Sequence, residues 1–218
     1  MDTHKKTSRW IDYKNAYKIL SGNISTIAIV ITGLIVGIVS FVLKDNMPET
    51  VGFISLLVAG FSILFVTMYG STQYMRYGFF VAMPIKTDNV IKSLYYIPFI
   101  SISILYAICI ISMAISGQCR MILIYLATYF ASCIVGFKMM DASDPANRET
   151  KAVLVILTCV GFGFVFGVVS ALGQKFLEMK SDEKFYTIII PIILVLLIVA
   201  FIVNKFSYKK FYKTIKNA

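Results

Sequence analysis

Long apolar runs alternate with short polar connections along most of the chain. Six of these runs contain no Asp, Glu, Lys, Arg or His. A helix needs about 20 apolar residues to cross a hydrocarbon core of about 30 Å, and each run approaches or reaches that length. The pattern predicts an all-α membrane protein with six transmembrane helices, over approximately Ile24–Leu43, Val51–Gly70, Ser93–Gly117, Met121–Phe137, Ala152–Gly173 and Phe185–Val203.

The composition points to the same class of protein. Of the 218 residues, 58% are hydrophobic and 15% are charged. One soluble core of this size could not bury so many apolar side chains, so we exclude a soluble globular protein. We divide the chain into an amphipathic N-terminal segment over residues 1–23, a six-span transmembrane domain over residues 24–206 and a basic tail over residues 207–218.

The basic residues predict the orientation of the spans. Of the 21 lysine and arginine residues, 16 lie in the N-terminal segment, the second and fourth connections and the tail, which are all on one side of the predicted spans. Lysine and arginine accumulate on the cytoplasmic side of membrane proteins. We therefore expect a multi-pass protein of the cell membrane with both termini in the cytoplasm. The net charge of +10 then reflects contact with anionic lipid headgroups, and we expect no nucleic-acid partner.

The segment before the first span predicts an amphipathic helix at the membrane surface. Trp10, Tyr13, Tyr17 and Leu20 follow one another at steps of three and four residues, which places them on one helical face. Basic residues occupy the other side, as in helices that lie in the headgroup region. Such a helix is either an anchor that fixes topology or an element that transmits force.

The sequence of the connection between the second and third spans predicts a short, structured segment on the cytoplasmic side. Tyr74–Met83 can form a short surface helix, and Pro84 then makes a corner. Thr87, Asp88 or Asn89 can accept hydrogen bonds from the free N–H groups of the helix that follows and runs into the third span. We interpret this stretch as a site where a soluble partner could grip the protein.

Small residues mark two helical faces that allow close packing. Gly33 and Gly37 form a GxxxG pattern in the first span, and Gly163, Gly167 and Ala171 form a longer pattern in the fifth. Such faces let helix backbones approach closely. They serve either packing within the chain or pairing with a second copy.

The second and fifth spans are rich in phenylalanine. Ordinary packing against lipid or protein explains any single ring. Taken together, an aromatic path without charges would suit an apolar or amphipathic substrate better than a sugar or an ion. The residues of this predicted path are Phe53, Phe61, Phe65, Phe162, Phe164 and Phe166.

Catalytic patterns are not found in the sequence. It has no phosphate-binding loop of the type GxxxxGK[ST], no HExxH and no GxSxG, and His4 is its one histidine. "DASD" at Asp141–Asp144 lacks the ligand spacing of a calcium loop. We expect a protein that is not an enzyme and that holds no cofactor or metal of its own.

The segment "MPIKTDNVIKS", Met83–Ser93, in a six-span protein with an amphipathic N-terminal helix, resembles the membrane subunits of ABC-2 type exporters. The chain is most similar to short bacterial permeases such as those that export phenol-soluble modulins and bacteriocins. The resemblance implies a cytoplasmic coupling helix between spans 2 and 3, a second permease as partner, and separate ABC subunits that bind ATP and magnesium. The coupling residues it implies are Tyr74, Arg76, Phe79, Phe80, Met83, Pro84, Lys86 and Asp88.

The function we expect is therefore that of a permease subunit of an ATP-driven exporter. Amphipathic, antimicrobial or toxin peptides are the preferred cargo, followed by hydrophobic drugs or lipids. The competing class is a membrane protein that does not transport and serves bacteriocin immunity or sensing by binding a partner within the bilayer.

Overall fold

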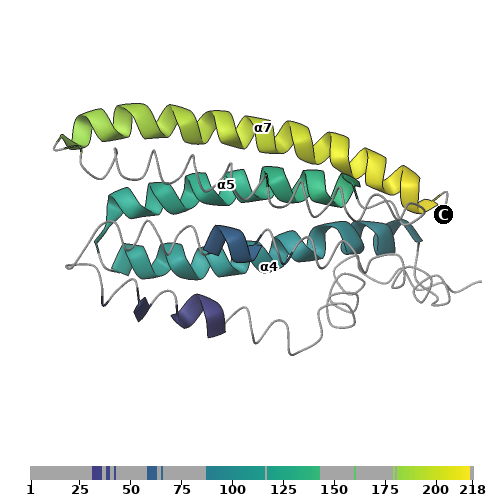
Figure 1. Ribbon diagram of the computed structural model, residues 1–218, viewed down its shortest axis with the longest axis horizontal. Coiled ribbons are helices and arrows are strands. Elements are labelled where there is room, and N and C mark those ends of the chain that lie inside the picture. The colour runs from purple at the N-terminus through teal and green to yellow at the C-terminus, as the bar shows by residue number, and fades with distance from the viewer. Residues whose placement is uncertain are drawn as a thin grey trace, which may run out of the picture.

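Three long helices dominate the part of the chain that the computed structural model describes. They are α4 (Thr87–Ile115), α5 (Cys119–Ala142) and α7 (Asp182–Lys216), shown in Figure 1. The described residues as a whole are 31–35, 38–39, 42, 58–62, 65, 87–115, 117–142, 160, 179 and 181–216. All of them are helical except for positions 117, 118, 179 and 181.

Each of the three helices is long and apolar enough to cross a membrane. They contain most of the third predicted span and all of the fourth and sixth, so the prediction of an all-α membrane protein is confirmed for this part of the chain. Described residues from the other three apolar runs, including 31–35 and 58–62, are also helical. Most residues of the other three predicted spans lie outside the described part of the chain, so the number of six spans stays a prediction. The predicted N-terminal amphipathic helix and the surface helix before Pro84 also lie outside it.

The ends of α4 follow from local sequence. The helix begins at Thr87, within the predicted capping cluster, and Asp88 in its first turn has the charge that a helix N-terminus favours. After Ile115, Gly117 has a φ of 72°, which a glycine adopts without steric cost. The N–H of Gly117 then donates to the carbonyl of Ala114 at 3.1 Å, and the N–H of Gln118 donates to that of Met113 at 3.0 Å. This helix end turns the chain directly into α5.

The three helices lie side by side, with α5 between α4 and α7 in the view of Figure 1. The short turn after α4 makes α5 antiparallel to it. Helix α7 runs in the same direction as α5, because the starts of both helices meet through Arg120 and Asp182. Near the opposite end, Tyr95 of α4 contacts Phe137 of α5 and Phe211 of α7.

Helix α7 is longer than its apolar run. Its 35 residues extend over about 52 Å, whereas the run Phe185–Val203 accounts for about 28 Å. The helix therefore continues for about 20 Å beyond Val203. Ser207, Phe211 and Ile215 are buried in this extension, so most of the segment predicted as a basic tail is a helical extension of the sixth predicted span.

Candidate functional site at the basic end of the helices

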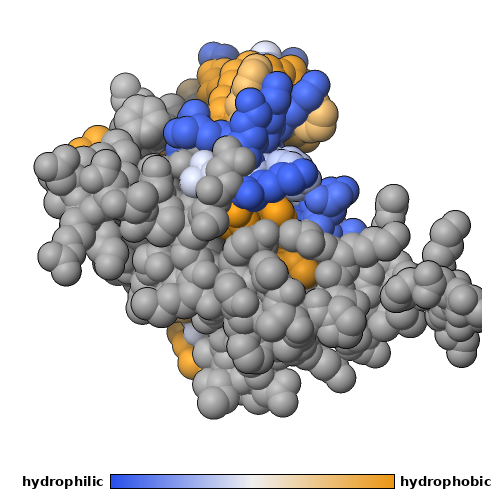
Figure 2. Space-filling model, turned by 90° about the vertical axis from the view of Figure 1, so that its right-hand side faces the viewer, coloured by the Kyte–Doolittle hydropathy of each residue, from blue (hydrophilic) through white to orange (hydrophobic). Residues whose placement is uncertain are grey.

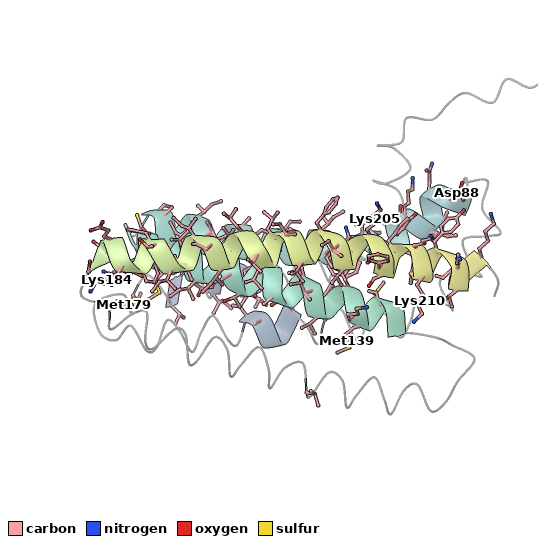
Figure 3. The ribbon with its side chains drawn as sticks, turned by 90° about the horizontal axis from the view of Figure 1, so that it is seen from above. Asp88, Met139, Met179, Lys184, Lys205 and Lys210 are labelled. Atoms are coloured by element: carbon pink, nitrogen blue, oxygen red, sulfur yellow. The ribbon has the colours of Figure 1, made fainter. Side chains whose placement is uncertain are left out.

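Basic side chains gather at one end of the described helices, where α4 begins and α5 and α7 end. Figure 3 shows Asp88, Lys205 and Lys210 toward this end, and Met179 and Lys184 at the other. Figure 2 looks onto this basic end and shows its hydrophilic residues in blue around apolar ones in orange. The described lysines here are Lys92, Lys138, Lys205, Lys209, Lys210, Lys213 and Lys216.

An aromatic cluster joins the three helices just inside the basic end. Tyr95 is fully buried; its ring stacks on Phe137 at 6.0 Å between centroids and meets the edge of Tyr208 at 5.3 Å. Phe211 lies 5.3 Å from Tyr95, and Phe99 lies 4.3 Å from Phe137. We call these five residues the aromatic junction. Aromatic pairs contribute about 0.5–1.5 kcal/mol each beyond their burial, so the start of α4 is firmly held against both other helices.

Polar contacts surround the aromatic junction. The hydroxyl of Tyr212 donates to Oδ1 of Asp88 at 2.6 Å, and Nζ of Lys216 lies 5.6 Å from the centre of the Tyr212 ring. The hydroxyl of Tyr95 donates to the backbone oxygen of Asn204 at 3.4 Å. The first turn of α4 is therefore tied to the last turns of α7, across more than 100 residues of sequence.

Helical spacing explains why these rings converge. Tyr95 and Phe99 are four residues apart on α4, and Phe211 and Tyr212 follow Tyr208 by three and four residues on α7. Residues at these separations lie on the same face of a helix. Each helix therefore presents an aromatic face near its end. The sequence analysis missed this junction. The aromatic residues at helical spacing, at the start of α4 and at the end of α7, were a signal that could have revealed it.

Of the predicted coupling residues, the structure describes Asp88. The first turn of α4 places it beside Tyr212, so one of its oxygens binds another helix. The remaining coupling residues lie outside the described part of the chain; they are Tyr74, Arg76, Phe79, Phe80, Met83, Pro84 and Lys86.

Gly33 is buried and packs closely against α4. A Cβ atom at this position would lie 3.1 Å from Cδ1 of Ile108 and 3.3 Å from Cδ1 of Leu105. Its neighbours Leu34 and Ile35 are exposed. Gly33 thus contacts another helix of the same chain. The other predicted small residues, Gly37, Gly163, Gly167 and Ala171, lie outside the described residues.

Two rings of the predicted translocation path are described. Phe61 is exposed, whereas Phe65 is half-buried and packs against the hydrophobic core. The two side chains thus have different surroundings. The other four, Phe53, Phe162, Phe164 and Phe166, lie outside the described residues.

Hydroxyl groups link α4 and α5 inside the apolar region. Ser103 and Tyr129 share a hydrogen bond of 2.7 Å, and Tyr106 and Ser132 share one of 3.2 Å. Such bonds between membrane helices contribute about 0.6 kcal/mol each on average. The sequence analysis did not single out these residues. In the described part of the chain, the interior is therefore uncharged but contains paired polar groups.

Arg120 makes a group of polar contacts at the opposite end of the helices, which we call the Arg120 clamp. Nε of Arg120 donates to Oδ1 of Asp182 at 2.7 Å, and a second guanidinium nitrogen, NH2, binds the same oxygen. NH1 donates to the backbone oxygen of Met179 at 2.6 Å, and the guanidinium carbon lies 5.3 Å from the centre of the Phe185 ring. The sequence analysis did not single out Arg120.

The chemistry of the described residues is that of binding and packing. In the part of the chain that the structure describes, no three His, Cys, Asp or Glu residues are grouped in a way that could hold a metal ion. Comparison of the chain with protein-family models, curated proteins and solved structures finds no match. Any functional conclusion must therefore come from the residues themselves.

Proposed function

We propose that this chain is the membrane permease subunit of an ATP-driven exporter. The aromatic junction is the observation that carries the proposal. It holds the start of α4 against the ends of α5 and α7, and α4 follows Pro84, where the sequence predicts a corner, by three residues. A push on the corner would then move three membrane helices together instead of bending one of them.

The basic end is the side on which we place the cytoplasm. The described lysines are concentrated there, while Asp182 and Glu183 offset Arg120 and Lys184 at the other end. This distribution supports an orientation in which the corner faces the cytoplasm, because lysine and arginine mark the cytoplasmic side. A soluble ATP-binding subunit would have access to the corner from that side.

The complete exporter would contain this chain, a second permease and two ABC subunits. ATP and magnesium would bind to the ABC subunits, and the two permeases would enclose the path. An interior without charged side chains in the described helices supports a cargo that is itself partly apolar. Amphipathic peptides are the cargo that we propose, with hydrophobic drugs and lipids as the other classes to test.

A reconstituted complex provides the test of this function. The chain would be co-expressed with any ABC-type ATP-binding protein found to be encoded by a neighbouring gene, and ATP hydrolysis would be measured in liposomes with a panel of amphipathic peptides, drugs and lipids. We expect the ATP-binding protein to co-purify with the chain and amphipathic peptides to stimulate hydrolysis. If no ATP-binding protein associates, the exporter proposal is wrong, and a role in immunity or sensing becomes the better explanation.

The coupling role of the basic end can be tested in the same complex. Tyr212→Phe keeps the ring and removes the bond to Asp88. Because this bond to a charged group is exposed to solvent, we expect peptide stimulation to fall about threefold without loss of assembly. Thr187→Val is the matched control, because it removes an exposed hydroxyl bonded to the Glu183 carbonyl at the far end of the same helix. Equal stimulation in both variants would contradict the coupling role.

A further inference from the structure

The exposed face of α7 changes from apolar to basic near the end of its apolar run. Ile198, Ile202 and Phe206 succeed one another at steps of four residues and are 56%, 47% and 67% exposed. Lys205 and Lys209 follow Ile202 at steps of three and four, and both are exposed. Residues at these steps share one helical face. A continuous stripe therefore begins with apolar side chains and ends with positive charges.

The height of the lysines matches the headgroup layer of a bilayer. With Val203 as the end of the apolar run, Lys205 lies about 3 Å and Lys209 about 9 Å further along the helix axis. The headgroup layer on each side of a bilayer is about 5–8 Å thick. Lysine stems lie along apolar surface while the ammonium group reaches polar surroundings, so both groups reach the phosphate level. Lys213, which is about 15 Å beyond Val203, lies above this layer.

No acidic group competes for these two lysines among the described residues. The sequence of α7 has no Asp or Glu after Glu183. The Asp88 carboxylate accepts from Tyr212, and in the described part of the chain no carboxylate forms an ion pair with Lys205 or Lys209. As far as the described residues are concerned, the two positive charges are therefore available to an external anion.

We propose that this face of α7 binds an anionic phospholipid. Ile198 and Ile202 contact the acyl chains, Phe206 lies at the boundary between the acyl chains and the headgroup, and Lys205 and Lys209 bind the phosphate group of the headgroup. The continuity of the apolar and basic parts favours a lipid over an acidic soluble protein, because such a protein would match the lysines but not the apolar side chains. The site does not depend on the exporter function.

The opposite end of α7 provides a natural contrast within the same helix. Ile188 is exposed there, and the described charges near it balance, because Asp182 and Glu183 offset Arg120 and Lys184. The described residues of this end therefore carry no net positive charge that would attract an anionic headgroup. A reporter near Ile188 therefore measures the background preference of the protein surface for lipid.

A tryptophan reporter can test the lipid site directly. Trp10 is the one native tryptophan, so a Trp10→Phe background allows Phe206→Trp to report the α7 site and Ile188→Trp to report the far end. Each variant is reconstituted in phosphatidylcholine vesicles that contain phosphatidylglycerol with brominated acyl chains. Because bromine quenches tryptophan only at close range, the quenching gives the relative affinity for the anionic lipid next to each reporter. The reverse labelling, with brominated phosphatidylcholine, corrects for differences in exposure.

Each result has a defined meaning. A lysine near an anionic surface contributes about a fivefold gain in association, so we expect at least fivefold enrichment of phosphatidylglycerol at the Phe206→Trp reporter and none at the Ile188→Trp reporter. Lys205→Ala with Lys209→Ala should abolish the enrichment, and Lys213→Ala should leave most of it. Equal quenching at both reporters, or enrichment that survives loss of both lysines, would overturn the proposal. Since the lysines are exposed, helical content measured by circular dichroism is expected to be unchanged in these variants.

Discussion

Tyr95 has the densest set of ring contacts among the described residues. Its ring meets Tyr96, Phe99, Phe137 and two rings of α7, so one side chain connects three helices. Lipid tails are as apolar as the protein interior, and membrane helices therefore associate through close packing and polar contacts. A large, fully buried ring at a three-helix contact supplies much of that packing.

Replacement of Tyr95 should separate packing from hydrogen bonding. Tyr95→Ala removes the ring, and we expect a loss of about 3 kcal/mol or more in the free energy of unfolding. Tyr95→Phe keeps the ring and removes the 3.4 Å bond to the backbone of Asn204, and the expected loss is about 1 kcal/mol or less. Unfolding in mixed detergent micelles, followed by circular dichroism, measures both values. Equal losses in the two variants would show that the hydroxyl, and not the ring, holds the junction.

At the scale of whole elements, the two ends of α7 are held in different ways. Its start is held by the charged clamp of Arg120, and its end by apolar burial of Phe211 and Ile215. The helix continues beyond the apolar run because its buried face still carries apolar side chains there. Its exposed face, in contrast, becomes basic. This amphipathic pattern lets α7 leave the hydrocarbon core and stay attached to α4 and α5.

Variants of the clamp should show that Arg120 contributes more than its ion pair. The side chain of Asp182 is 70% exposed, so the pair itself is screened by water and contributes about 1 kcal/mol or less. Asp182→Ala should therefore have a small effect that decreases further in high salt. Arg120→Ala should cost more, because it also removes the bond to Met179 and the contact with Phe185. Unfolding of both single variants and the double variant measures the coupling, and a larger loss for Asp182→Ala would contradict this assignment.

At the scale of the molecule, the ends of the described helices differ in charge. Uncharged interiors separate a lysine-rich end from an end where acidic and basic residues balance. Both helices α5 and α7 cross from the balanced end to the basic end. If this axis is perpendicular to the membrane, as the apolar lengths of the helices require, the two ends must face opposite compartments.

Labelling of single cysteines tests this arrangement. Cys119 is exposed at the balanced end, and Thr214→Cys would introduce a thiol at the basic end. With the other cysteines replaced by serine or alanine, a thiol reagent that cannot cross membranes should reach Cys119 from outside intact cells. The Thr214→Cys variant, with Cys119 replaced, should react only in inverted vesicles, because lysine-rich ends face the cytoplasm. Labelling of both positions from the same side would refute the orientation.

The apolar runs and the distribution of charge were sufficient to predict the three long helices and their polarity. A bilayer forces backbone groups to bond within the same segment, so an apolar run of sufficient length implies a helix, whatever its neighbours are. Local signals of the same kind placed the start of α4 at the Thr87 cluster and its end near Gly117. The distribution of lysines defined a basic side, because charge is counted along the chain and needs no contacts.

The pairing of helix faces depends on the tertiary structure. Asp88 was one of three residues predicted as a possible cap, and the structure shows its carboxylate accepting from Tyr212, which is 124 residues away, while Gly33 fits against Leu105 and Ile108. Helical periodicity identifies a face, but it does not identify the face opposite, because many apolar stripes can pack with similar energy. The extension of α7 beyond Val203 depends on tertiary contacts in the same way, since Phe211 packs against the Tyr95 ring of α4.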